Sequence, residues 1–548
     1  MSGPERHRPT VPGSIAEAAR LLRSRELSSA ELTAAVLARA DELDPLLGTY
    51  LSRFDAPAMA AAEQADRELA GGTDRGPLHG IPLGIKDILA TVEGPTTAQS
   101  LVLDRRWGAG KDAPVVARLR AAGAVVTGKT TTMEFAIGSP DPAKPFPWPR
   151  NPWDPATWPG GSSSGTATGV AAGLFLGGLG TDTGGSIRIP SAFCGVTGLM
   201  PTYGRVPKSG CVPLGYSLDH VGPMARTARD CGVMLAAMAG HHPSDPDSVD
   251  RPGPDMAGQL RSSLAGLRIG VVREGHFPDG TDPAVAPAFA AAVGVLGGLG
   301  ATLVEAALPL YAEMMAVNAV TMLAEALAYH RSTLGPRWGD YGSPTRLFLA
   351  QGAFVAGADV VRAQQVLRAV QRRLADTFAA VDLVVMPTLS LGAPRYDQLD
   401  RMDDLFGLMH TPYWNPAGHP VLAVPMGFND GGLPLSLQLA SPPFTEPLLV
   451  AVGDAFQGVT DWHRRVPPLV TGWAGGGAVP SAAGLPGPPA GPLPPASPPS
   501  DAAVGATSLL LSRAGIHATG DELVHLAARY PGITAMIELL YRLDLGDD

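Results

Sequence analysis

The spacing of apolar and polar residues predicts helices and strands that alternate along most of the chain. Apolar residues recur every three or four positions at 14–22, 28–43, 58–69 and 114–122, as in amphipathic helices. Short apolar runs predict strands at 124–127, 268–272, 301–308, 381–386, 421–425 and 435–439, and a further helix is expected after Pro287. Residues 80–88 are apolar apart from Lys86 and Asp87. Such alternation predicts an α/β fold whose helices cover both faces of a sheet.

A proline-rich segment separates this body from the end of the chain. Nine of the twenty residues from Pro480 to Pro499 are proline, which is typical of a semi-rigid, extended linker. We therefore divide the chain into a body at 1–470, a linker at 471–504 and a small module at 505–548.

The module has the pattern of short amphipathic helices. The first is expected at 506–513, and Thr519-x-x-Glu522 is a capping box that begins the second, which Pro531 should end. Thr534 can cap a third. Forty-odd residues cannot hold a stable core alone, so we expect the module to pack on its own body or on that of a neighbouring protomer.

Composition narrows the class of protein. The chain has 548 residues and a net charge of −10, which argues against direct nucleic-acid binding through bulk charge. Its three cysteines form no CxxC pair, which favours a reducing compartment, and the first residues have no apolar signal segment, so we expect a cytoplasmic protein. Residues 283–304 carry no charge, but prolines and glycines interrupt them, so we expect no membrane span.

Two clusters of glycine and serine mark the centre of the sequence. Residues 160–191 read GGSSSGTATGVAAGLFLGGLGTDTGGSIRIPS. Glycines at this density let the backbone approach a ligand closely, and free N–H groups beside a hydroxyl suit acyl transfer. The alternative is a flexible glycine–serine linker, but the ordered, apolar stretch between the clusters argues against it.

A lysine within an apolar run is the second candidate for chemistry. Lys86 ends the stretch HGIPLGIK and is followed by Asp87. Burial lowers the pKa of a lysine and can make it a base near neutral pH. An ion pair with Asp87 or with another acid is an equally open interpretation of Lys86.

Residues 123–130 read GAVVTGKT and match the phosphate-loop pattern G-x-x-x-x-G-K-[ST]. We reject that interpretation because the residues between the two glycines are themselves expected to form a strand, where a phosphate loop needs a turn. No Cys, His, Asp and Glu spacing suggests a metal site, and we expect no cofactor.

Taken together, these segments resemble the amidase signature family. The similarity extends to GPLHGIPLGIKDI, GKTTTMEFA, NPWDPATWPGGSSSG, NPAGHPVLAVPMGF and GLPLSLQLASP, and covers most of residues 14–465. It implies a three-layer α/β/α fold around a mixed sheet. The family more often has GGSSGG where this chain has Ser164.

The resemblance assigns roles residue by residue. It implies a Ser–cisSer–Lys triad in which Ser186 is the nucleophile, Ser162 the bridging serine and Lys86 the base. It also implies an oxyanion hole made by backbone N–H groups and a charge pair that braces the loop. The hole would use Thr183, Gly184, Gly185 and Ser186, and the pair would be Asp182 and Arg188.

The implied activity is hydrolysis of a small-molecule amide by an acyl-enzyme route, with release of ammonia or an amine. The alternative is the glutamine-hydrolysing A subunit of a tRNA-dependent amidotransferase, which delivers ammonia to a partner subunit. The module at 505–548 faintly resembles the C-type accessory subunits of such enzymes, and a homodimer is possible. We expect the acyl pocket to be built from residues 134–150 and 310–410.

Overall fold

A mixed β-sheet forms the centre of the computed structural model, which describes residues 11–256, 258, 260–401, 407–490 and 497–545. Its described strands follow the order β1-β3-β2-β4-β6-β5-β10-β11-β9-β7-β8. Neighbours are parallel within β3-β2-β4 and within β9-β7-β8, and antiparallel elsewhere. The strands are β1 (Tyr50–Arg53), β2 (Pro82–Lys86), β3 (Val125–Thr130), β4 (Gly177–Asp182), β5 (Thr197–Met200), β6 (His220–Ala225), β7 (Arg268–Val272), β8 (Thr302–Ala306), β9 (Leu383–Pro387), β10 (Val421–Phe428) and β11 (Pro434–Ala440).

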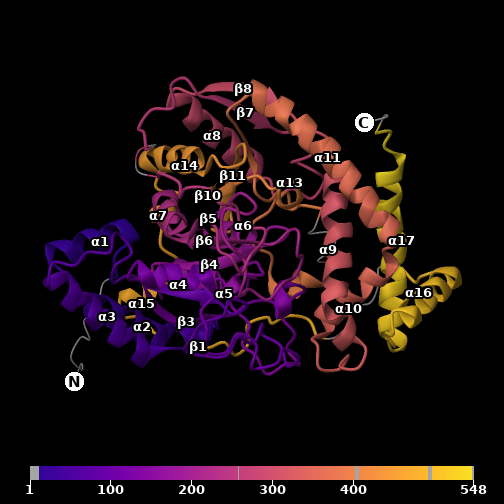
Figure 1. Ribbon diagram of the computed structural model, residues 1–548, viewed down its shortest axis with the longest axis horizontal. Coiled ribbons are helices and arrows are strands. Elements are labelled where there is room, and N and C mark those ends of the chain that lie inside the picture. Colours follow the sequence, from indigo (N-terminus) through magenta and orange to yellow (C-terminus); the bar gives the residue numbers. More distant parts are fainter. Residues whose placement is uncertain (1–10, 257, 259, 402–406, 491–496, 546–548) are drawn as a thin grey trace.

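Helices cover both faces of the sheet, which confirms the expected three-layer α/β/α fold (Figure 1). Strand β9 shows why both faces are apolar. Leu383 and Val385 join a core with α1, α7, α8 and α14, whereas Val384 and Met386 join another with α9 and α11. The helices of the body are α1 (Ile15–Ser24), α2 (Ser29–Leu47), α3 (Asp55–Ala70), α4 (Pro114–Ala121), α5 (Ser164–Ala172), α6 (Arg188–Cys194), α7 (Ala228–Met238), α8 (Val285–Gly298), α9 (Tyr311–Leu334), α10 (Ser343–Ala350), α11 (Gly357–Ala380), α13 (Trp414–Ala417), α14 (Glu446–Val459) and α15 (Pro468–Ala474).

The local sequence explains where several of these helices begin. The capping box predicted at Ser28 and Glu31 is present at the start of α2. Helix α8 begins at Val285, before Pro287 rather than after it. Pro287 lies in the first turn, where a backbone N–H has no helical partner, so the ring does no harm there. None of the described helices has the length and apolar character needed to cross a bilayer.

Two helices, α16 (Asp501–Arg513) and α17 (Gly520–Arg542), lie beside α9, α10 and α11 of the same chain (Figure 1). Leu526, Ile533 and Leu540 are buried, and they follow one another at intervals of seven residues along α17. Glu522 forms an ion pair with Arg346, with 2.7 Å between the charged atoms, in a largely buried position. The apolar stripe and this ion pair hold α17 against the body.

The expectations that Pro531 ends a helix and that Thr534 caps another are wrong, since Thr534 lies inside α17 and its hydroxyl donates to the carbonyl of Tyr530 at 3.0 Å. The capping box at Thr519 is present, but α17 continues through Pro531 as a single helix. A proline inside a helix costs about 3 kcal/mol because it removes a hydrogen bond and crowds the preceding turn. Ile533 and Leu540 pack against the body beyond Pro531, and we attribute the continuation of the helix to this packing.

Helices α15 and α16 lie on opposite sides of the molecule (Figure 1). Helix α15 lies near α2 and α3. Trp473 of α15 donates its indole N–H to Glu42, and further along Arg150 donates to the carbonyl of Pro486 at 2.8 Å. Helix α16 begins at Asp501, inside the segment that the sequence assigned to the linker.

Candidate active site

Lys86 lies at the end of β2, between β3 and β4 in the sheet, with its side chain fully buried. Its Nζ is 2.7 Å from Ser162 Oγ and 2.7 Å from Thr181 Oγ1. Burial lowers the pKa of Lys86 to about 7, and the more distant Cys211, Asp182 and Asp219 offset this only in part. A lysine with that pKa is substantially neutral near neutral pH and can accept a proton.

The geometry decides which acid, if any, pairs with Lys86. Asp87 forms an ion pair with Lys129, with Nζ 2.9 Å from Oδ1, and it also accepts the N–H of Thr97. Across the described ranges no carboxylate lies within ion-pairing distance of Lys86. Lys86 contacts hydroxyl groups instead of an acid.

The same contact accounts for the sequence GAVVTGKT. Most of it is strand β3, and helix α4 precedes it, so the residues between the two glycines form no phosphate-binding turn. Lys129 points into the interior and is held by Asp87 and the hydroxyl of Thr96. Lys129 therefore pairs with Asp87 in the interior and is not placed to bind a phosphate.

Ser162 lies just before helix α5, and the peptide bond between Gly161 and Ser162 is cis. The carbonyl of Ser162 accepts the hydroxyl of Thr132 at 2.9 Å. The N–H of Ser163 donates to the carbonyl of Ser186 at 3.2 Å, which ties the two serine-containing segments together. Lys86, Ser162 and Ser186 thus come from three segments that meet at one end of β2 and β4.

Ser186 differs from the other two residues in its exposure. It is partly exposed, whereas Ser162 and Lys86 are buried. The loop from Thr183 to Ser186 follows β4 directly. At Gly185 the φ angle is +131°, and an added Cβ would lie 2.1 Å from Thr411 Oγ1, so this position requires glycine.

The N–H groups of this loop divide into two sets. Gly185 donates to Asp182 Oδ1 at 2.6 Å, so its N–H is occupied, which corrects the expectation that it faces an oxyanion. Within the residues described here, the N–H groups of Thr183, Gly184 and Ser186 have no hydrogen-bond acceptor. Three donors therefore remain for a ligand.

Asp182 and Arg188 form a bidentate pair behind the loop, with Nε–Oδ2 and Nη2–Oδ1 distances of 3.0 and 2.9 Å. Both side chains are fully buried. Burial raises the pKa of Asp182, but the charge and hydrogen bonds of Arg188 outweigh it and bring the pKa down to about 2. The carboxylate stays ionised and also accepts the N–H of Ile187.

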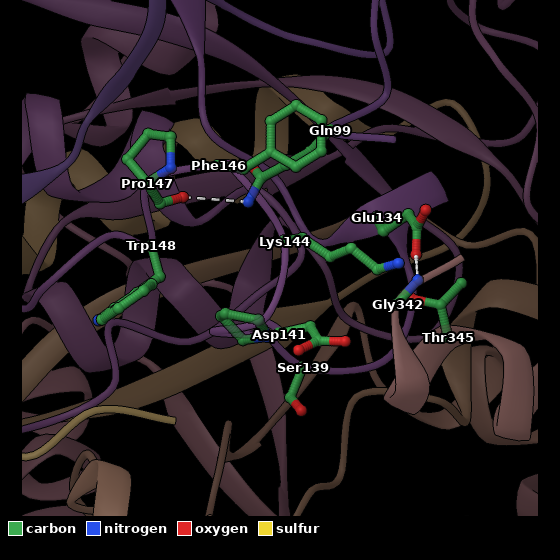
Figure 2. Close-up of a pocket in the computed structure, with 11 residues that line it drawn as sticks. Gln99, Glu134, Ser139, Asp141, Lys144, Phe146, Pro147, Trp148, Gly342 and Thr345 are labelled. Atoms are coloured by element: carbon green, nitrogen blue, oxygen red, sulfur yellow. Dashed lines mark hydrogen bonds between the residues drawn. The ribbon is translucent and has the colours of Figure 1, made fainter. Parts of the chain in front are cut away.

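A pocket opens between the two segments that were expected to form the acyl pocket. Figure 2 shows Glu134, Gly342 and Thr345 at one end, and Pro147 and Trp148 at the other. The N–H of Gly342 donates to Glu134 at 2.7 Å. The pocket wall adjoins the segment that contains Ser162, because Gln99 accepts the N–H of Thr132, whose hydroxyl donates to the carbonyl of Ser162.

Sequence reasoning did not single out four side chains around this site. Thr181 contacts Lys86 and lies in the quoted motif GTDTGG, and Asn415 contacts Asp182 and lies in NPAGHP, so both motifs contained the information. Asn318 and Thr411 contact the loop from outside these motifs. For Asn318, the only sequence indication was an asparagine within the apolar stretch AVNAV.

Comparison with known proteins gives a consistent result. A model of the family described as Amidase matches residues 31–450. The A subunit of glutamyl-tRNA(Gln) amidotransferase from Roseiflexus castenholzii is 41% identical, over 83% of this chain and 97% of its own length. Relatives with the same description in other bacteria share 38 to 41%.

Solved structures of two kinds are also similar. A chain from a structure described as a vestigial protein complex that reveals the evolutionary origins of an s-triazine catabolic enzyme has a TM-score of 0.75 at 30% identity, over 81% of this chain and 98% of its own. The peptide amidase of Stenotrophomonas maltophilia has a TM-score of 0.70 at 32% identity, over 83% and 98%.

Proposed function

The chain belongs to the amidase signature family, and from this membership we propose that it cleaves a carbon–nitrogen amide bond through Lys86, Ser162 and Ser186. The observation that carries the proposal is the buried contact of 2.7 Å between Lys86 Nζ and Ser162 Oγ. Because Lys86 has a pKa of about 7 and contacts a hydroxyl group, it is better suited to act as a base than as a member of an ion pair.

The reaction begins with proton transfer along the triad. Neutral Lys86 accepts the proton of Ser162 Oγ, which in turn accepts the proton of Ser186 Oγ. Ser186 Oγ then forms a bond to the carbonyl carbon of the amide, and the carbonyl oxygen takes the electron pair of its double bond. The exposure of Ser186 supports its role as the group that meets the substrate.

The second half of the reaction returns the proton. The N–H groups of Thr183, Gly184 and Ser186 stabilise the oxyanion, since they have no other acceptor among the described residues. The carbon–nitrogen bond breaks, and the leaving nitrogen receives the proton of Lys86 through Ser162. Water then hydrolyses the ester between Ser186 and the acyl group, and the free enzyme returns.

The substrate is either glutamine, as for the A subunit of an amidotransferase, or another amide that the chain hydrolyses on its own. The relatives favour glutamine. The relatives from Roseiflexus and other bacteria are described as amidotransferase A subunits, so glutamine is the first amide to test. In that case the ammonia passes to a partner subunit. Stand-alone hydrolysis of another amide has its own support, because α17 is part of this chain and packs on α9 without a second subunit.

The test is ammonia release from a panel of primary amides that includes glutamine. Ser186→Ala should lose all measurable activity, whereas Ser164→Ala should retain it. Ser164 is the matched control because it lies in the same motif and its hydroxyl makes no hydrogen bond among the described residues. Equal loss in both variants, or none in Ser186→Ala, contradicts the proposal. Glutamine turnover only after a B-type subunit is added would favour the amidotransferase.

A further inference from the structure

We propose that Asn318, Thr411 and Asn415 are positioning residues: Asn318 and Asn415 aim oxyanion-binding N–H groups by holding carbonyls of the same loop, and Thr411 holds the adjoining peptide in place. This inference rests on the proposed function. The three side chains come from α9, from the segment before α13 and from α13 itself. None of them belongs to the triad.

Three successive carbonyls of the loop each accept a hydrogen bond from one of these side chains. Asn415 Nδ2 donates to the carbonyl of Asp182 at 3.0 Å, and Asn318 Nδ2 donates to that of Thr183 at 3.0 Å. Thr411 Oγ1 donates to the carbonyl of Gly184 at 2.8 Å. The three donor side chains are at most 2% exposed.

Because a peptide group is planar, a side chain that fixes its carbonyl also fixes the direction of its N–H. In a planar trans peptide the C=O and the following N–H point in opposite directions, and these peptides are trans. The carbonyl of Asp182 therefore sets the N–H of Thr183, and the carbonyl of Thr183 sets the N–H of Gly184. These are two of the three N–H groups that lack an acceptor in the described part of the chain.

The third contact fixes the next peptide of the loop, between Gly184 and Gly185. The carbonyl of Gly184 sets the N–H of Gly185, which points to Asp182 Oδ1 instead of the ligand. Thr411 thus holds the peptide between Gly184 and Gly185 in one orientation, next to the two peptides that supply the N–H groups of Thr183 and Gly184. All three contacts set the direction of peptide groups in the loop, and none of the three side chains touches the reacting atoms.

The donors are themselves fixed in orientation. Asn415 Oδ1 accepts Arg188 Nη2 at 2.8 Å, and Asn415 Nδ2 also donates to Asp182 Oδ1 at 2.8 Å, so the amide cannot rotate without losing three hydrogen bonds. The carbonyl of Thr411 accepts Arg188 Nη1 at 2.8 Å. Asn318 must turn its NH₂ group toward a carbonyl, which leaves its Oδ1 beside Gly184, 3.3 Å from where a Cβ would be.

The size of the effect follows from what an oxyanion donor contributes. Removal of one such donor costs about 100- to 1000-fold in kcat in a well-studied case. A side chain that only aims the donor should contribute less, because the loop can relax partly. We expect Asn318→Leu, which keeps the volume and loses the donor, to lower kcat about 10- to 100-fold with little change in KM.

The experiment measures how fast a fluorophosphonate labels Ser186, with peptide mapping of the product. The Ser186 Oγ–P bond forms, the P–F bond breaks, fluoride leaves, and the phosphoryl oxygen occupies the oxyanion site. Asn318→Leu should label about tenfold or more slowly. Thr321→Val, a buried polar change on the same helix, should label at the unaltered rate.

A second pair of variants covers the case in which Asn318→Leu does not fold. Thr411→Val removes the hydroxyl and keeps the shape, and should label several-fold more slowly than Thr411→Ser, which keeps the hydrogen bond. Equal labelling rates in folded Asn318→Leu and the unaltered protein, or in the two Thr411 variants, overturn the positioning role alone. Label on a serine other than Ser186 overturns the proposed function, and the positioning role with it.

Discussion

Replacement of Lys86 by methionine should make the protein more stable while it abolishes catalysis. Methionine has nearly the same length as lysine and no charge to bury. Burial brings the pKa of Lys86 from its usual 10.5 to about 7, so folding at neutral pH forces the lysine to release its proton or to bury its charge. That requirement disappears in Lys86→Met.

The magnitude follows from the size of the shift. Each pKa unit corresponds to about 1.36 kcal/mol, so burial of Lys86 costs about 4 kcal/mol at pH 7. The two hydrogen bonds to Ser162 and Thr181 offset about 2 kcal/mol of this, at roughly 1 kcal/mol each. We therefore expect Lys86→Met to raise the free energy of unfolding by about 2 kcal/mol at pH 7.

The dependence on pH separates this explanation from simple repacking. Between about pH 7 and pH 10.5 the unfolded chain holds the Lys86 proton and the folded chain does not, so the stability of the unaltered protein rises with pH. The advantage of Lys86→Met should shrink by about 2 kcal/mol from pH 7 to pH 9.

Urea unfolding at pH 7, 8 and 9, followed by tryptophan fluorescence, measures the difference. Lys111→Met is the control because Lys111 is exposed, and its stability difference should not change over this range. A Lys86→Met protein that is less stable throughout, or whose advantage is constant with pH, refutes the reasoning.

Three further predictions concern the rate profile of Lys86, the ion pair of Lys129 and the C-terminal helices. The hydrolysis rate should rise with pH around a midpoint near 7, as Lys86 loses its proton, and a rate that is flat from pH 6 to 9 contradicts that role. Lys129→Ala should lower the free energy of unfolding by about 3 to 5 kcal/mol in urea titrations, since it leaves Asp87 buried and unpaired; an unchanged unfolding midpoint argues against this. Removal of residues 500–548 should lower the melting temperature and leave Ser186 reactive toward the fluorophosphonate. Limited proteolysis of the intact chain should cut first between 480 and 499. Rapid proteolytic loss of α17 instead would mean that this helix does not pack stably on the body.

Part of the order of strands and helices was predictable because it depends on local patterns, but strands β1, β5 and β6 and the long helices α9 and α11 were not predicted. Short apolar runs located β9, β10 and β11 within a few residues, and the capping residues Ser28 and Thr519 located two helix starts. Pro531 was misjudged because its local effect is smaller than the packing of α17, which involves residues far away in the sequence.

Within the candidate site, the same division holds. The glycine and serine motifs are contiguous in the chain, so they identify the loop around Ser186 from the sequence alone. The choice of Lys129 rather than Lys86 as the partner of Asp87 depends on how β2 and β3 lie side by side, which no local pattern states. The contacts of Asn318 and Thr411 are also non-local, since they join α9 and the segment before α13 to the loop after β4.

The covalent link between the body and α17 has a consequence for mass action. A helix tethered by a flexible or semi-rigid segment that spans its site meets that site at an effective concentration of about a millimolar, whatever the concentration of protein. Dilution therefore cannot dissociate α17 from α9, and each body carries one copy of the helix. A separate peptide with the sequence of α17 would need to exceed that concentration before it displaced the tethered helix.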